Sequence, residues 1–139
     1  MGWTKIKRSK ADILFSDFIR GKAKWRCEYC HKLCRIENEW IARLEASHYF
    51  GRAHRATRFD LENVYALCGS CHKRMGGYKK SEDGEYDLWV KEKLGDYLYK
   101  KLKIRANAYY KKDEKMELLY VKGLIGGIGG VKEGKYTVC

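Results

Sequence analysis

The segment CEYCHKLC, residues 27–34, places three cysteines and one histidine within eight positions. A second cysteine pair, CGSC, occupies residues 68–71. A C-x-x-C turn presents two thiolates to one metal ion, and two such turns complete a tetrahedral four-thiolate site. The predicted ligands of a structural Zn²⁺ ion are therefore Cys27, Cys30, Cys68 and Cys71.

A redox role is the alternative for either cysteine pair. A thioredoxin-like pair needs a βαβ context, which the flanking sequence does not provide. A disulfide framework is disfavoured because the chain is expected to be cytoplasmic. Cys34 and Cys139 are then predicted to be free thiols, and His31 a surface histidine. Zinc binding would add folding free energy to a chain with a modest core.

Length and composition predict one domain in a cytoplasmic protein. The chain has 139 residues, of which 45% are hydrophobic, enough for a single modest core. Its longest apolar runs are far too short to span a bilayer, so no membrane-spanning segment is expected. The basic N-terminal sequence MGWTKIKRSK has no apolar region behind it that would form a signal peptide.

The charge of the chain is strongly positive. Thirty lysines and arginines against 18 acidic residues give a formal net charge of +12. Such an excess attracts polyanions and adds no stability to the fold. Nucleic acid is the expected partner, an anionic membrane surface is the second candidate, and a basic surface that only aids solubility is the third explanation.

The pattern of apolar residues predicts a mixed α+β protein. Ser9 and Asp12 are typical of a helix start, and apolar residues at helical spacing predict a helix over about 10–20 that ends at Gly21. The other predicted elements are strands at 40–50 and 63–67, a short helix after Cys68, and helices at about 85–102 and 112–122.

These elements form one predicted domain over residues 1–125. It comprises a basic N-terminal segment with its helix (1–24), a zinc-bound core (25–80) and C-terminal helices (84–122). A glycine-rich tail follows at 123–139.

The segment between the cysteine pairs carries residues suited to catalysis. His48 lies near the end of a predicted strand, Asn63 precedes the second cysteine pair, and His72 follows it directly. This order of residues resembles the HNH (ββα-metal) nucleases, and ENVYALCGSCHKR is close to that family's usual stretch from the asparagine to the final histidine. Taken singly, His48 and His72 are as readily explained as a core histidine and a capping residue.

A narrower resemblance covers about residues 11–122. The segments ADILFSDFIR, ASHYFGR and RFDLENVYALC are similar to the NinG/Rap-type recombination nucleases of phages. The resemblance implies a small ββα-metal, treble-clef-like core held by the four-cysteine zinc site, with flanking helices. It also implies a metal-dependent DNA endonuclease that cuts branched recombination intermediates, such as Holliday junctions and D-loops, in the host-cell cytoplasm if the protein is phage-encoded.

The resemblance assigns roles to the three residues. His48 would be the general base that takes a proton from the attacking water, because a neutral imidazole can accept one. Asn63 would hydrogen-bond the backbone or the His48 ring and orient it. His72 would ligate a catalytic Mg²⁺ or Mn²⁺ ion that stabilises charge at the leaving oxygen.

One departure from the family concerns the second ligand of the catalytic metal. Many HNH nucleases have an aspartate or histidine before the base, where this chain has Ser47. Glu45 is the candidate ligand instead, and Asp60 is another possibility. On a regular strand Glu45 and His48 face opposite sides, so a bulge or bend would be needed to bring them together.

Basic residues near these positions are candidates for DNA binding. We expect the loop after the first strand to grip phosphates, with Arg58 nearest the site, because arginine binds phosphate in a bidentate manner. An exposed loop with weak, nonspecific attraction is the alternative. The candidate DNA-binding residues are Arg52, His54, Arg55, Arg58, Lys73 and Arg74.

Two further expectations concern partners. A homodimer would suit symmetric cutting of a four-way junction, and branched or partly single-stranded DNA is the expected substrate. Tyr109, Tyr110 and Tyr120 could serve either a protein interface or base stacking. The alternative function is a non-catalytic zinc-knuckle protein that only binds nucleic acid.

Overall fold

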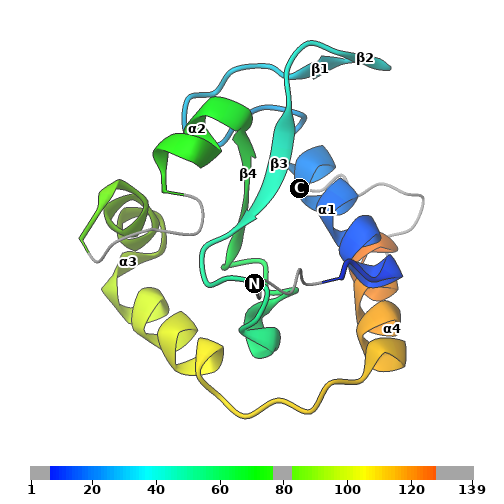
Figure 1. The fold of residues 1–139 in the computed structure, drawn as a ribbon, viewed down its shortest axis with the longest axis vertical. Coiled ribbons are helices and arrows are strands. Elements are labelled where there is room, and N and C mark those ends of the chain that lie inside the picture. The colour runs from blue at the N-terminus through cyan, green and yellow to red at the C-terminus, as the bar shows by residue number, and fades with distance from the viewer. Residues whose placement is uncertain (1–6, 77–82, 128–139) are drawn as a thin grey trace, which may run out of the picture.

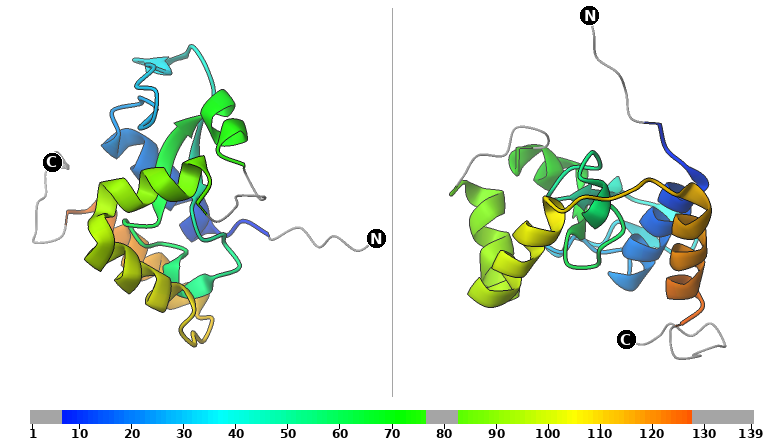
Figure 2. Two further views of the ribbon diagram at one scale, coloured as in Figure 1. Left: turned by 90° about the vertical axis from the view of Figure 1, so that its left-hand side faces the viewer. Right: turned by 90° about the horizontal axis from the view of Figure 1, so that it is seen from below.

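The computed structural model describes residues 7–76 and 83–127, and the α+β class is confirmed. Most of the glycine-rich tail, with Cys139, lies outside these residues. Figure 1 shows the arrangement and Figure 2 shows it from two further sides. The elements are α1 (Lys10–Lys22), β1 (Arg35–Ile36), β2 (Glu39–Trp40), β3 (Leu44–His48), the 3₁₀ helix η1 (Arg55–Thr57), β4 (Val64–Cys68), α2 (Gly69–Arg74), α3 (Glu85–Ala106) and α4 (Glu114–Ile125).

Helix α1 begins where the sequence predicts. The Ser9 hydroxyl accepts the Asp12 N–H, and the Asp12 carboxylate accepts the Ser9 N–H at 2.6 Å, forming a capping box. Ala11, Phe15 and Ile19 recur at helical spacing and are buried. The predicted helix over 10–20 is confirmed and continues to Lys22.

The centre of the molecule is the antiparallel hairpin of β3 and β4. Its register is regular, from Leu44 opposite Cys68 to His48 opposite Val64. All of β4 is buried, because α1 and α4 lie on one side of the hairpin and α2 and α3 on the other (Figure 1). The predicted strand over 40–50 is shorter in the structure because a separate small hairpin, β1–β2, ends at Trp40.

The two C-terminal helices differ from prediction mainly in their ends. Helix α3 runs on to Ala106 and is kinked at Gly95, whose φ of +83° favours a residue without Cβ. Helix α4 begins later, because the Asp113 side chain accepts the Met116 N–H and sets its N-cap. Within the described residues no helix is long and apolar enough to cross a membrane.

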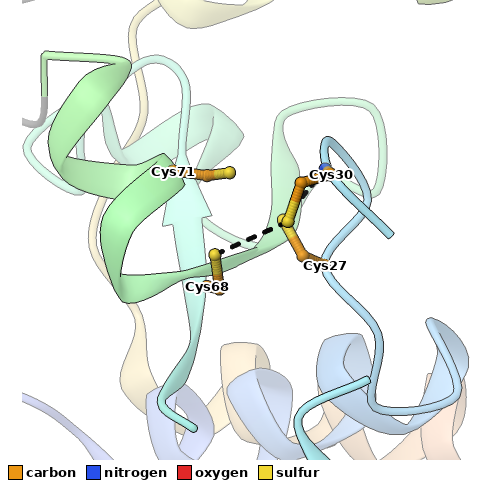
Figure 3. Close-up of side chains that lie close together, drawn as sticks. All are labelled: Cys27, Cys30, Cys68 and Cys71. Carbon is orange, nitrogen blue, oxygen red and sulfur yellow. Dashed lines mark hydrogen bonds between the residues drawn. The ribbon is translucent and has the colours of Figure 1, made fainter. Parts of the chain in front are cut away.

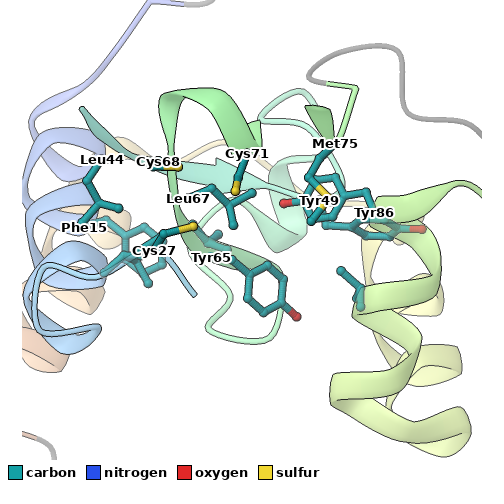
Figure 4. Packing of buried hydrophobic residues seen from close by; sticks show 14 of the residues in the cluster. Phe15, Cys27, Leu44, Tyr49, Tyr65, Leu67, Cys68, Cys71, Met75 and Tyr86 are labelled. Atoms are coloured by element: carbon teal, nitrogen blue, oxygen red, sulfur yellow. The ribbon is translucent and has the colours of Figure 1, made fainter. Parts of the chain in front are cut away.

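One hydrophobic core joins these layers (Figure 4). Phe15 of α1, Leu67 of β4 and Tyr86 of α3 belong to the same buried cluster. Cys27 and Cys68 belong to it as well, with 0% and 2% of their surface exposed. Three of the predicted zinc ligands, Cys27, Cys68 and Cys71, are therefore part of the wall of the core, so a change at these three also changes its packing, whereas Cys30 is exposed.

A buried ion pair ties α1 to the loop before β4. The Arg58 guanidinium donates to both oxygens of Asp12, at 2.8 and 2.5 Å, and both side chains are almost fully buried. Burial opposes ionisation of Asp12, but hydrogen bonds from Arg58 and from the Ser9 N–H outweigh it and lower the pKa of Asp12 to about 2. Either charge alone would therefore be buried without a partner.

Replacing Asp12 by Asn is expected to destabilise the protein by about 3–5 kcal/mol, because it leaves the Arg58 charge buried without its partner. Denaturant unfolding at pH 7 measures this change. The matched control is Asp17→Asn on the same helix. Asp17 pairs with Arg20 but is 62% exposed, so its loss should cost no more than about 1 kcal/mol. Equal effects of the two substitutions would contradict the structural role of the buried pair.

The ion pair of Asp12 and Arg58 also predicts how the free energy of unfolding depends on pH. Because folding lowers the pKa of Asp12 from 3.8 to about 2, its contribution is complete above about pH 4 and is lost as the pH falls toward 2. Wild type should therefore lose more stability than Asp12→Asn between pH 5 and pH 3. Parallel stability curves for the two proteins would show that Asp12 does not carry this dependence.

Candidate metal centre and neighbouring histidines

The four predicted zinc ligands come together in space (Figure 3). The sulfur atoms of Cys27, Cys30, Cys68 and Cys71 all lie within 4.8 Å of one another, and those of Cys30 and Cys68 are 3.8 Å apart. A tetrahedral site with Zn–S bonds of about 2.3 Å has sulfur–sulfur edges of about 3.8 Å. The donor set therefore fits a zinc ion, and no disulfide joins any of the cysteines that the structure describes.

The backbone of the first cysteine pair forms a turn suited to metal binding. The N–H groups of Tyr29 and Cys30 both point to the Cys27 sulfur, at 3.4 Å each. The turn then needs a residue in the left-handed region, and His31 supplies it with φ of +66°. The side chain of His31 is exposed, so its contribution here lies in the backbone.

The turn at Cys27–Cys30 is attached to the outer edge of β4. The Glu28 N–H donates to the Ala66 carbonyl at 2.8 Å, and the Ala66 N–H donates to the Glu28 carboxylate at 2.8 Å. Cys68 ends β4, and Cys71 lies in α2 directly after it. A metal ion bound here would therefore fix the N-terminal loop, the hairpin and α2 to one another.

Burial and crowding separate the thiol pKa values. Burial raises the pKa of Cys71, and the neighbouring thiols raise it further. Burial alone would also raise the pKa of Cys68. Hydrogen bonds from the Cys71 N–H, the Ser70 hydroxyl and the Cys71 thiol outweigh it and lower this pKa to about 6. Four thiolates this close need a cation to be stable together, which a divalent metal ion provides.

Cys34 lies outside the four-cysteine group. It is fully buried, and its thiol points to the Lys32 carbonyl at 3.6 Å. Burial raises the pKa of Cys34, which keeps the thiol protonated and unreactive. The prediction of a free thiol is confirmed.

Glu45 and His72 are in direct contact next to the cysteine group. A Glu45 oxygen meets Nδ1 of His72, and its other oxygen lies 2.6 Å from the Arg43 guanidinium. Both side chains are partly open to solvent, His72 at 32% and Glu45 at 26%. The structure therefore brings together the two residues predicted to bind the catalytic metal.

His48 is half-buried on the other face of β3. Its Nε2 lies 3.0 Å from the Arg58 carbonyl, and since a carbonyl only accepts, Nε2 carries the proton and Nδ1 keeps a lone pair. Burial lowers the pKa of His48 to about 4, although the hydrogen bond to the Arg58 carbonyl by itself raises it. The ring is thus neutral at pH 7, the form that a general base needs.

Asn63 holds the loop between the two strands. Its side-chain oxygen accepts the Phe50 N–H at 2.8 Å, and its amide donates to the carbonyls of Phe50 and Thr57 at 2.9 and 3.0 Å. The residue is fully buried. Of the two partners predicted for Asn63, backbone and the His48 ring, the structure shows the backbone, so Asn63 acts on His48 only through the loop.

The predicted catalytic residues do not all meet in one place. The regular register, without a bulge, keeps Glu45 and His48 on opposite faces of the hairpin. The four cysteines are the only group of three or more potential metal ligands within residues 7–76 and 83–127. Asp60, the other candidate ligand, is held instead by Arg105 of α3 at 2.8 Å.

Ser47, which the motif resemblance places where many HNH nucleases have a metal ligand, is also engaged. Its hydroxyl is 2.7 Å from the Tyr86 hydroxyl, and it is 1% exposed. Ser47 thus anchors α3 on the hairpin.

The predicted DNA-binding residues divide into paired and free side chains. The prediction for Arg58 is wrong, because Arg58 is 2% exposed and its charge is used by Asp12. Arg55 is bound by Glu117 of α4 through two contacts at 2.9 and 2.7 Å, and it too is little exposed.

The remaining predicted DNA-binding residues lie nearer the surface. His54 contacts the Ala106 carbonyl at 3.0 Å, and Arg74 pairs with Glu85 at 3.3 Å. Neither Lys73 nor Arg52 has an ion-pair partner in the described part of the chain. Of the six, these two are best placed to meet a polyanion.

Comparison of the chain with family models, with curated proteins and with solved structures found no match.

Proposed function

We propose that this protein is a metal-dependent DNA endonuclease that hydrolyses phosphodiester bonds. The observation that carries the proposal is the contact between Glu45 and His72, beside a four-cysteine group suited to zinc. A carboxylate that is partly open to solvent is a suitable ligand for Mg²⁺ or Mn²⁺, and the imidazole beside it would be the second protein ligand.

The residues divide the chemical work as follows. A divalent ion at Glu45 and His72 would supply stabilisation of negative charge on the scissile phosphate. His48 is neutral, and its free Nδ1 can take a proton from water. Asn63 fixes the loop that follows His48 by its three backbone contacts. Arg52 and Lys73 offer unpaired positive charge for the phosphate backbone.

The substrate and context are a further part of the proposal. The resemblance to NinG/Rap-type nucleases supports branched recombination intermediates as substrates and a phage recombination pathway as the setting. The net charge of +12 supports a polyanionic partner of either kind, branched or linear.

A non-catalytic nucleic-acid-binding protein is the second candidate. It is favoured by the position of His48 on the face of β3 opposite Glu45, with its ring held by a backbone carbonyl as in many structural histidines. The zinc group and the basic surface would then serve binding alone.

A cleavage assay separates the two functions. The protein is incubated with supercoiled plasmid and with a four-way junction, in Mg²⁺, in Mn²⁺ or without added divalent ion. A chelator is avoided because it would also attack the four-cysteine centre. The nuclease requires metal-dependent cleavage of at least one substrate. Binding without cleavage under every condition would reject the nuclease and favour the second candidate.

Glu45→Gln is expected to raise the Mg²⁺ concentration needed for half-maximal cleavage by at least about tenfold, because an amide is a poorer ligand for a hard cation than a carboxylate. The measurement is a Mg²⁺ titration of the cleavage rate. Glu92→Gln is the matched control, since Glu92 is exposed on α3 and far from the hairpin in sequence. An unchanged Mg²⁺ requirement in Glu45→Gln would exclude Glu45 as a ligand.

A further inference from the structure

We propose that a basic cleft beside the first cysteine pair binds the phosphate backbone of DNA, at a place separate from Glu45 and His72. The inference rests on the proposed function only in taking DNA as the partner. The cleft has a volume of about 270 Å³, and the residues that define it here are Lys22, Arg26, Glu28, His31 and Lys93. It is called the knuckle cleft below.

Three cations from different parts of the chain converge on the knuckle cleft. Lys22 is in the last turn of α1, Arg26 is in the loop before Cys27, and Lys93 is on α3. All three side chains are exposed. Cations brought together by separate elements form a concave positive surface, which suits a phosphate better than a flat one does.

Contacts with neighbouring groups hold two of these cations in place. The Arg26 guanidinium donates to the His31 carbonyl at 3.1 Å, so the backbone just after the first cysteine pair positions it. The Lys93 ammonium lies over the Trp89 ring, 5.1 Å from its centre. Lys22 has no ion-pair partner among residues 7–76 and 83–127.

The knuckle cleft is positive because its three cations face one carboxylate. One oxygen of Glu28 accepts the Ala66 N–H, and the other is 3.9 Å from the Lys93 ammonium. Lys22, Arg26 and Lys93 against Glu28 leave a net positive charge at the cleft. A phosphate diester carries the complementary charge.

A larger pocket of the molecule shows a different balance of charge. It has a volume of about 530 Å³ and lies between η1, α3 and α4. Its two arginines, Arg55 and Arg105, are bound by Glu117 and by Asp60 and Glu62. Its positive charge is therefore neutralised within the protein, which makes the smaller knuckle cleft the better anion site.

The residues of the knuckle cleft favour backbone contacts over base recognition or membrane binding. Lysine and arginine that meet phosphates position a nucleic acid without reading its sequence. Membrane-surface binding usually adds an apolar face, and none of the residues lining this cleft is a large apolar one. We therefore expect binding that is sensitive to salt and indifferent to sequence.

The test compares two triple variants that remove the same charge. Lys22→Ala/Arg26→Ala/Lys93→Ala removes the cations of the knuckle cleft. Lys100→Ala/Lys101→Ala/Lys103→Ala removes three exposed lysines from the second half of α3. Affinity for a short DNA duplex is measured by fluorescence anisotropy over a range of salt concentrations, without added divalent ion. Circular dichroism and zinc content confirm that each variant is folded.

The knuckle-cleft variant should bind DNA at least about tenfold more weakly than wild type. The slope of log K against log salt concentration should become shallower by about 0.9 for each lost phosphate contact. The α3 variant should stay close to wild type in both measurements. Equal losses of DNA affinity in both variants would overturn the proposal, since they would show a general effect of charge. Weaker binding to anionic lipid vesicles, with unchanged binding to DNA, would overturn it as well. The double variant Lys22→Ala/Arg26→Ala leaves the contact of Lys93 with Trp89 intact. It must also bind DNA more weakly than wild type. Failure of the nuclease proposal is distinguishable, because it gives normal binding without cleavage.

Discussion

Removal of the metal from the four-cysteine centre is expected to unfold the protein. Structural zinc contributes about 10–16 kcal/mol of apparent binding free energy in small domains, as much as the total stability of a typical domain. Here three of the four cysteines, Cys27, Cys68 and Cys71, form part of the core wall, and the group connects the N-terminal loop, the hairpin and α2. Cys68→Ser, or treatment with a strong chelator, should therefore abolish the cooperative thermal transition seen by circular dichroism.

Cys34→Ala is the matched control for this prediction. Cys34 is as buried as Cys68, but it is not part of the four-cysteine group. The variant should keep one zinc ion per chain and lose only about 1 kcal/mol for the small cavity. A Cys68→Ser protein that still melts cooperatively near the wild-type temperature would show that the centre is not a structural metal site.

His48→Gln is expected to lower the rate of DNA cleavage by about 10²- to 10⁴-fold, the usual contribution of a general base. Glutamine can still donate a hydrogen bond to the Arg58 carbonyl, so the loop should keep its conformation. It has no lone-pair nitrogen to accept a proton from water. Single-turnover cleavage measures the rate, and anisotropy should show DNA affinity within a few-fold of wild type.

His48→Ala separates the catalytic role from a structural one. It removes both the base and the hydrogen bond to the Arg58 carbonyl, so it should lose stability as well as activity. If His48 were only structural, the glutamine variant would cleave DNA at the wild-type rate and only the alanine variant would be impaired. Full activity in both variants would remove His48 from the mechanism.

Features that depend on neighbours in the chain were largely predictable. The capping box at Ser9 and Asp12 involves residues three positions apart, and the start of α1 follows from it. The two C-x-x-C spacings each make a local turn, and together they identified the cysteine group that the structure brings within metal-binding distance. The alternation along β3 correctly placed Glu45 and His48 on opposite faces.

Features that depend on distant partners were not predictable in the same way. The charges of Arg58 and Arg55 looked available for DNA, but Asp12 and Glu117, which are 46 and 62 residues away, take them up. The left-handed backbone at His31 has no strong signal, because this conformation is usual for glycine and only occasional for histidine.

The four-cysteine group and the main helices and strands thus follow from local spacing, because hydrogen bonds and bond geometry act over a few residues. Which arginines stay free, which carboxylate meets His72 and where the cations of the knuckle cleft converge follow only from folding. The energy of an ion pair depends on the distance and burial of groups far apart in the chain, and the order of residues alone does not specify either quantity.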